Sequence, residues 1–178
     1  MRRLATCEPY HSSPMPASRV RRATPGDSEG IRRIYNAAVL TTTATLDLVP
    51  RDAGEQRAWM AEHSGVYPVL VEGEGEEVWG FSCLSAYRPR PGYATVVEDS
   101  VYVDEARRGQ GIGRSLLEAA VEAARTHGFH SVIGRVITEQ EASMALHRAC
   151  GFDVVGIERE VGRKFGRWLD VALLQRML

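Results

Sequence analysis

Three glycines stand at alternate positions in the stretch "RRGQGIGR", at Gly109, Gly111 and Gly113. Glycine lets the backbone adopt positive φ and approach a ligand closely. The apolar-striped segment that follows predicts a helix, and backbone N–H groups at a helix N-terminus bind anions, most often phosphate. The stretch therefore predicts a phosphate-binding turn with basic side chains at its rim; a glycine turn without a ligand is the alternative explanation.

The spacing of these glycines excludes two common phosphate-binding motifs. It is not GxxxxGK followed by Ser or Thr, so the turn is not a P-loop, and it is not the GxGxxG of a dinucleotide site. In addition, no acidic residue about 20 positions further on ends a second strand, as a ribose ligand would. The phosphate compound is therefore of another kind.

Two arginines in the stretch "YRPRPGY", Arg88 and Arg90, are suited to hold a carboxylate, because the planar guanidinium makes paired hydrogen bonds with one. A solvated charged loop explains them equally well. Cys83 and Cys150 could in principle form an acyl-enzyme. No base stands near either cysteine at a recognisable spacing, and a free cysteine is more often a small buried hydrophobic residue.

A regular succession of strands and helices begins at Val20. "SRVRRAT" predicts a short strand, and a helix follows from Thr24 and Pro25 with its apolar side chains on one face. "TTTATLD" is interpreted as a solvated turn, and "DAGEQRAWMAEH" as a second helix. Three strands come next, "YPVLVEG", "EVWGFSCLSAY" and "TVVEDSVYV", the first two joined by a hairpin turn.

Helix and strand alternate again after the glycine stretch. A helix with a continuous apolar stripe ends at Gly128, and "SVIGRVI" predicts a buried strand. Thr138 and Glu141 have capping-box spacing, which predicts a short helix through Cys150. Two further strands, "DVVGIEREV" and "WLDVALLQRML", complete a mixed sheet with helices on its faces, in the α/β (α+β) class.

The amino-acid composition indicates which class of molecule the protein binds. The chain has 178 residues, with 22 basic against 23 acidic side chains and no long run of either sign. We therefore expect a small-molecule partner, and no binding to nucleic acid or membrane. The three scattered cysteines indicate neither disulfides nor a metal site, and predict a reducing, cytoplasmic location. Residues 1–17 are expected to form a flexible tail, and residues 18–178 a single domain.

The segment "RGQGIG" fits the R/Q-x-x-G-x-G/A pyrophosphate loop of the GNAT family of N-acetyltransferases. With "VEDSVYV" before it and "SMALHRACGF" after it, the chain resembles this family over residues 20–178. The resemblance implies the GNAT fold, with a mostly antiparallel central sheet and helices on both faces, and acetyl-CoA as acyl donor. The acetyl-CoA-binding residues that it implies are Val101, Tyr102, Val103, Arg108, Gly109, Gln110, Gly111, Ile112, Gly113, Arg114, Gln140 and Ser143.

Segments outside this loop resemble the branch that contains phosphinothricin and methionine sulfoximine acetyltransferases. They are "TTTATLD", "YPVLV", "SAYRPRPGYATVVEDSVYV" and "GRKFGRWLDVALLQR". The resemblance implies a homodimer that acetylates the α-amine of a small amino acid or amino-acid analogue bearing a carboxylate. The substrate-binding residues that it implies are Arg88, Pro89, Arg90, Glu98, Asp99, Ser100, Leu46, Lys164 and Trp168, with Thr43 and Phe165 as further neighbours.

Acetyl transfer to an amine requires a base and an acid. An α-amine is largely protonated at neutral pH, and Glu98, in an otherwise apolar strand, is expected to take its proton through a water. The alternative is that Glu98 only pairs with an arginine such as Arg88. Where many GNAT members have a tyrosine acid, this chain has His147; it is expected either to protonate the leaving thiolate or to be structural.

Because no base stands near Cys83 or Cys150 to support an acyl-enzyme, we expect direct transfer in a ternary complex. The resemblance implies that a backbone N–H near Val101 polarises the acetyl carbonyl. Two other functions remain open: a GNAT enzyme for a protein N-terminus, a polyamine or an aminoglycoside, and a non-catalytic acetyl-CoA-binding module. Arg88 and Arg90 argue against polycationic substrates, whereas Gln140, in place of the family's usual asparagine, and His147 keep the non-catalytic module open.

Overall fold

The computed structural model describes residues 20–178. The predicted tail, residues 1–17, and Cys7 lie outside this range. Within it, no helix is both long enough and apolar enough to cross a membrane. In the same range, no three or more His, Cys, Asp or Glu side chains form a group that could hold a metal ion.

Residues 20–178 contain one seven-stranded sheet in the order β1-β2-β3-β4-β5-β7-β6. Only β4 and β5 pair in parallel, and every other neighbouring pair is antiparallel. The strands are β1 Val20–Arg22, β2 Val69–Glu74, β3 Glu77–Ala86, β4 Val96–Val103, β5 Ser131–Ile137, β6 Asp153–Lys164 and β7 Arg167–Met177.

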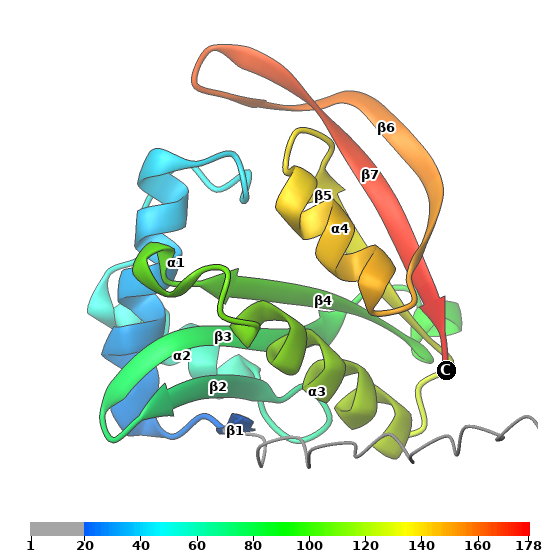
Figure 1. Ribbon diagram of the computed structural model, residues 1–178. Coiled ribbons are helices and arrows are strands. Elements are labelled where there is room, and N and C mark those ends of the chain that lie inside the picture. The colour runs from blue at the N-terminus through cyan, green and yellow to red at the C-terminus, as the bar shows by residue number, and fades with distance from the viewer. Residues whose placement is uncertain (1–19) are drawn as a thin grey trace, which may run out of the picture.

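Helices cover both faces of this sheet, as the sequence predicts (Figure 1). The α-helices are α1 Ser28–Thr41, α2 Ala53–Glu62, α3 Ile112–Thr126 and α4 Glu141–Ala149. Alternation along β2 shows how the strands divide the core: Val69 and Val71 pack in the cluster that contains the α1 side chains, whereas Leu70 packs in the cluster that contains those of α3. Each face thus has its own apolar layer.

Every helix and strand predicted from the sequence is present, but the cap predicted for α4 is wrong. The N-cap residue is Gln140, and no side chain makes a capping hydrogen bond there. Thr138 lies two residues before this N-cap, and its backbone N–H donates to the carbonyl of Asp170 at 3.0 Å, which continues the pairing of β5 with β7. The strand therefore extends further than the capping-box spacing suggested, and the helix begins after it.

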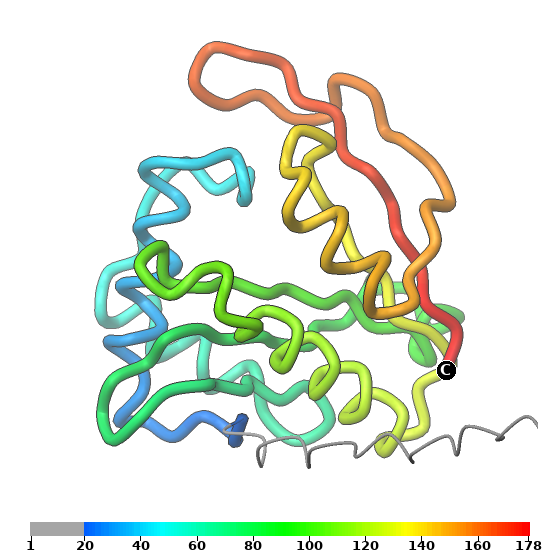
Figure 2. Tube along the Cα trace, in the orientation of Figure 1, coloured from blue at the N-terminus to red at the C-terminus, as the bar shows by residue number. Residues whose placement is uncertain are grey.

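The parallel pairing of β4 and β5 ends at the pair Asp99–Gly134. Beyond this point β4 continues to Val103 and pairs only with β3, while β5 pairs only with β7. Figure 2 shows the consequence, because the second half of β4 and the segment of β5 with α4 run apart. An opening in the middle of the sheet results, and the helices α1 and α4 stand on its two sides.

Leu116 of α3 is fully buried in the apolar layer between α3 and the sheet. We expect Leu116→Ala to lower the free energy of unfolding by about 2–5 kcal/mol, because the lost contacts leave a cavity that the core fills only in part. Urea denaturation of the two proteins measures the difference. Leu48→Ala is the control, since Leu48 is 66% exposed; an equal loss in both variants would contradict this description of the core.

Candidate functional site

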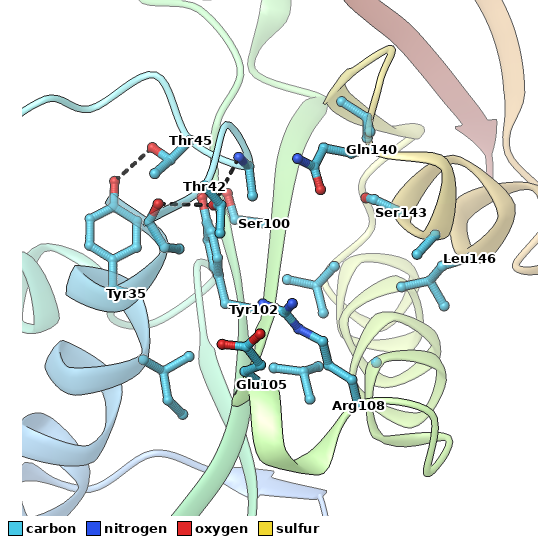
Figure 3. Close-up of a pocket in the computed structure, with 18 of the residues that line it drawn as sticks. Tyr35, Thr42, Thr45, Ser100, Tyr102, Glu105, Arg108, Gln140, Ser143 and Leu146 are labelled. Carbon is cyan, nitrogen blue, oxygen red and sulfur yellow. Dashed lines mark hydrogen bonds between the residues drawn. The ribbon is translucent and has the colours of Figure 1, made fainter. Parts of the chain in front are cut away.

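A cavity of about 750 Å³ lies where β4 and β5 separate. Its lining comes from α1 and the loop after it, from β4, from the glycine turn and the start of α3, and from β5 and α4. In Figure 3, Tyr35 and Thr45 lie on one side, Gln140 and Ser143 on the other, and Ser100 of β4 between them. The cavity is therefore bounded by segments that are far apart in the sequence.

Most residues predicted to form the site line this one cavity. They are Leu46, Glu98, Asp99, Ser100, Val101, Tyr102, Val103, Arg108, Gly109, Gly111, Ile112, Gly113, Arg114, Gln140, Ser143 and His147. Six predicted residues are not part of its lining: Arg88, Pro89, Arg90, Gln110, Lys164 and Trp168.

The glycine turn leads directly into α3, as predicted. Gly109 and Gly111 have φ of 77° and 84°, a backbone conformation that side chains with a Cβ rarely adopt. A Cβ at either position would meet no atom within 4 Å, so conformation and not space requires glycine there. At Gly113 space is limiting, because a Cβ would lie 3.2 Å from Leu146 Cδ2 of α4. The turn thus brings the N-terminus of α3 to the cavity.

Glu98 lies on β4 opposite Ser85 of β3 and is partly buried. Burial raises the pKa of its carboxyl group, and the charge of Arg135, followed by the weaker effect of Arg88, acts in the opposite direction. Among the described residues no ion pair or hydrogen bond joins Glu98 to Arg88. The alternative in which Glu98 only pairs with Arg88 therefore has no ion pair to support it.

Asp99 points to the opposite face of β4, where it pairs with His147 of α4. The distance from His147 Nε2 to Asp99 Oδ2 is 3.2 Å, and the two side chains are 3% and 1% exposed. His147 Nδ1 lies 2.8 Å from the carbonyl oxygen of Ser143. Both partners are acceptors, so both ring nitrogens donate only when the imidazole is protonated. The geometry thus describes a buried imidazolium–carboxylate pair.

The electrostatics of His147 agree with this protonation state. Burial by itself lowers the pKa of the imidazole, but the hydrogen bond and the charge of Asp99, with the carbonyl of Ser143, outweigh it and raise the pKa above its ordinary value. Gly134 of β5 makes room for the pair, since a Cβ there would lie 2.8 Å from His147 Cδ2. The ion pair therefore joins α4 to the sheet at the last paired residues of β4 and β5.

The threonine-rich loop after α1 is not the solvated turn that its sequence suggested. Thr43 is only 7% exposed, and its Oγ1 accepts a hydrogen bond of 2.8 Å from Gln140 Nε2 at the start of α4. Buried polar side chains are normally hydrogen-bonded in this way. In this structure the amide of Gln140 joins the two sides of the cavity, and its predicted contact with the cofactor stays a prediction.

Two further contacts hold the same loop against the β6–β7 hairpin. Lys164 is 3% exposed, and its Nζ donates to the carbonyl of Thr45 at 2.8 Å. Leu46 packs beside Gly162, where a Cβ would lie 2.6 Å from Leu46 Cδ1. Burial lowers the pKa of Lys164. The structure thus places Lys164 behind the loop that lines the cavity, with Leu46 at the cavity itself.

The other predicted substrate residues lie at exposed positions. Arg88 stands over the rings of Tyr87 and Tyr93, with Cζ 5.0 and 5.7 Å from their centroids. Trp168 is 59% exposed, and Arg163 lies over its ring at 5.5 Å. Within one chain, neither Arg88 nor Trp168 closes the cavity.

Tyr35 and Arg135 are among the cavity residues that were not identified as site residues from the sequence. Tyr35 was placed on the core face of α1, but its hydroxyl group reaches Thr45 Oγ1 at 3.2 Å and its ring packs edge-on against Tyr102. Arg135 was included in a buried strand. The signal that could have identified Arg135 is a charged residue inside the otherwise apolar run "SVIGRVI".

Comparison with known proteins identifies related chains. The sequence profile of the Acetyltransferase (GNAT) family matches residues 31–152. An L-methionine sulfoximine/L-methionine sulfone acetyltransferase from Pseudomonas paraeruginosa is 40% identical over 158 residues, which cover 88% of this chain and 92% of that protein. A phosphinothricin N-acetyltransferase from Streptomyces coelicolor is 37% identical over 171 residues, covering 92% of this chain and 100% of that protein.

A solved structure gives the same result for the fold. The crystal structure of a phosphinothricin acetyltransferase from Sinorhizobium meliloti in complex with acetyl-CoA superimposes with a TM-score of 0.86 and 37% identity. The match covers 89% of this chain and 87% of that one.

The pH dependence of stability tests the His147–Asp99 pair. Because folding raises the pKa of His147, its protonation stabilises the folded state fully below the unfolded-state pKa of about 6.5, and this contribution is lost as pH rises through the folded pKa. We expect the fall in unfolding free energy across this range to disappear in Asp99→Asn, as measured by urea denaturation at several pH values.

The control is His63→Gln, which should keep the fall, because burial lowers the pKa of His63 and its contribution has the opposite sign. An unchanged pH slope in Asp99→Asn would contradict the assignment of a protonated His147.

Proposed function

The chain belongs to the GNAT family of acetyltransferases, and we propose that it acetylates the α-amine of a small amino acid or amino-acid analogue that bears a carboxylate. The observation that carries the proposal is the position of Glu98. This partly buried carboxylate lines the cavity on β4, close to the end of the parallel pairing, and the glycine turn opens onto the same cavity. Related proteins that act on methionine sulfoximine, methionine sulfone and phosphinothricin support this substrate class.

The residues at the α3 end of the cavity fit acetyl-CoA. Gly109, Gly111 and the N-terminal amides of α3 would hold the pyrophosphate. Val101 and Val103 belong to the part of β4 that has no partner on the β5 side. Their backbone would pair with the extended arm of acetyl-CoA, and an N–H near Val101 would polarise the acetyl carbonyl. Bound acetyl-CoA supplies the activated acyl group.

The proton transfers would use the two sides of β4. Glu98 removes a proton from the ammonium group through a water, and the free amine attacks the thioester carbon directly. The C–S bond breaks, the nitrogen of the new amide releases its second proton to the solvent through the same water, and the thiolate takes a proton from His147, whose imidazolium lines the cavity. The neutral ring that remains keeps one N–H for Asp99 or for the carbonyl of Ser143. No covalent acyl-enzyme is formed in these reaction steps.

We propose that the protein forms a homodimer and that it is located in the cytoplasm. Several apolar side chains of the β6–β7 hairpin are exposed: Val155, Ile157, Val161, Phe165 and Trp168. In Figure 1 this hairpin extends past the other elements. An exposed apolar surface of this kind on an edge strand is typical of a protein–protein interface. A second copy would cover it and bring more side chains to the site, whereas the substrate roles of Arg88, Arg90 and Trp168 stay predictions.

The test of function is thiol release from acetyl-CoA with a panel of amines. The panel contains methionine sulfoximine, methionine sulfone, phosphinothricin, the common amino acids, spermidine and an aminoglycoside. We expect turnover of carboxylate-bearing amines, and a loss of about 100-fold or more in kcat for Glu98→Gln. Because burial raises the pKa of Glu98, the acidic limb of the wild-type kcat/KM profile should lie above the ordinary range for glutamate.

Glu105→Gln is the matched control, since Glu105 lies at the glycine-turn side of the same cavity. It should keep the kcat of the wild type. Turnover of the polycations alone would contradict the proposed substrate class, and binding of acetyl-CoA without any turnover would favour a non-catalytic module.

Sedimentation velocity tests the homodimer. Ile157 is 56% exposed on the edge strand β6, and Ile157→Glu should produce monomers because it places a charge in an apolar interface. The control is Val66→Glu in the loop before β2, where Val66 is 43% exposed. A monomeric wild type, or a dimer that Ile157→Glu leaves intact, would contradict an interface on this hairpin.

A further inference from the structure

Arg135 occupies a special position on β5. The last pair between β4 and β5 is Asp99–Gly134, so Arg135 is the first residue of β5 beyond the parallel ladder. It lines the cavity at this point. A cation therefore lies where the sheet opens, in a strand whose other residues are all buried.

Arg135 and Glu98 lie on the same face of the sheet. Residues paired in a parallel ladder point to the same side, and Glu98 pairs with Ile133, two positions before Arg135. Their electrostatic coupling agrees with this placement. After the dominant effect of burial, which raises the pKa of Glu98, the charge of Arg135 is the strongest influence, and it lowers that pKa. An anion and a cation are thus neighbours in the cavity.

The remaining arginines of the cavity lining belong to its other end. Arg33 pairs with Asp104, Arg107 with Glu77, and Arg114 with Glu118. Arg108 lies in the glycine turn itself. Among the arginines that line the cavity, Arg135 is therefore the one at the Glu98 end, and the imidazolium of His147 is already paired with Asp99 on the other face.

Glu158 of β6 holds Arg135 without covering it. The carboxylate of Glu158 accepts a hydrogen bond from Arg135 Nη2, and the two side chains are 36% and 38% exposed. A guanidinium group has five N–H donors in a planar fork. One bond to Glu158 leaves donors for a second anion, and it fixes the direction of the side chain.

We propose that Arg135 binds the α-carboxylate of the amine substrate while Glu98, beside it on the same face, receives the ammonium group. The α-carbon of an amino acid bears both an ammonium group and a carboxylate group. A site that recognises both groups therefore needs a cation and an anion next to each other. The planar fork suits the two oxygens of a carboxylate. This inference rests on the proposed function, and it names the residue that selects carboxylate-bearing amines.

The experiment compares an acid with its amide in wild type and Arg135→Met, for example methionine sulfone and its carboxamide. The pH is kept well above the pKa of Glu98, so that a shift of that pKa does not affect the rates. We expect Arg135→Met to raise KM for the acid about 10- to 100-fold, with little change in kcat. For the amide, KM should change by less than about 3-fold, and Arg135→Lys should be intermediate for the acid because it keeps the charge and loses the fork.

Arg125→Met is the matched control. Arg125 pairs with Glu122 on the surface of α3, with a side-chain exposure of 48%, and does not line the site cavity. This variant should keep the kinetic constants of the wild type for both compounds.

The outcomes separate this inference from the proposed function. If wild type acetylates no carboxylate-bearing amine, the proposed function fails and the inference fails with it. If wild type acetylates the acid but Arg135→Met changes acid and amide equally, or if only Arg88→Ala causes the acid-selective rise, the inference alone is overturned. If wild type does not accept the amide as a substrate, the test uses KM for the acid alone. A higher KM in Arg135→Met than in wild type supports the role of Arg135, and an unchanged KM overturns it.

Discussion

The end of the parallel pairing between β4 and β5 is the constraint on which the rest of the site depends. Up to Asp99 and Gly134 the two strands share a ladder, and beyond them each pairs only with its outer neighbour. A continuous sheet would fill this space with hydrogen bonds. The separation instead exposes the edge of β4 to a cavity of about 750 Å³. The His147–Asp99 pair lies at this branching point, where it attaches α4 to the last paired residues.

The alternation of side chains along β4 gives two adjacent acidic residues different roles. Asp99 lies on the α4 face and is buried against an imidazolium, whose charge compensates for the loss of hydration. Glu98 lies on the other face and lines the cavity, and within residues 20–178 no cation forms an ion pair with it. A single step along a strand therefore separates a carboxylate that supports the fold from one that is available to accept a proton.

The sequence predicts the elements well because their signals are local. The glycine turn, the apolar stripe of α3 and the alternating strands are visible in short windows, and the predicted residues of the turn do reach the cavity. Contacts between distant segments were not predictable in this way. The Thr43–Gln140 hydrogen bond joins residues 97 positions apart, and Lys164 reaches Thr45 across 119. Both depend on how the loop after α1 crosses to α4 and β6, for which no single segment carries a signal.

Because Arg135 lies close to Glu98, binding of the substrate carboxylate also affects the basicity of Glu98. In the free protein, burial raises the pKa of Glu98 and the charge of Arg135 partly offsets it. A carboxylate bound to Arg135 neutralises much of that positive charge, so the offset becomes smaller and Glu98 becomes a stronger base. A neutral ligand at the same position has no such effect. The carboxylate that identifies the substrate would thus also prepare the base that removes its proton, and one residue would link recognition to chemistry.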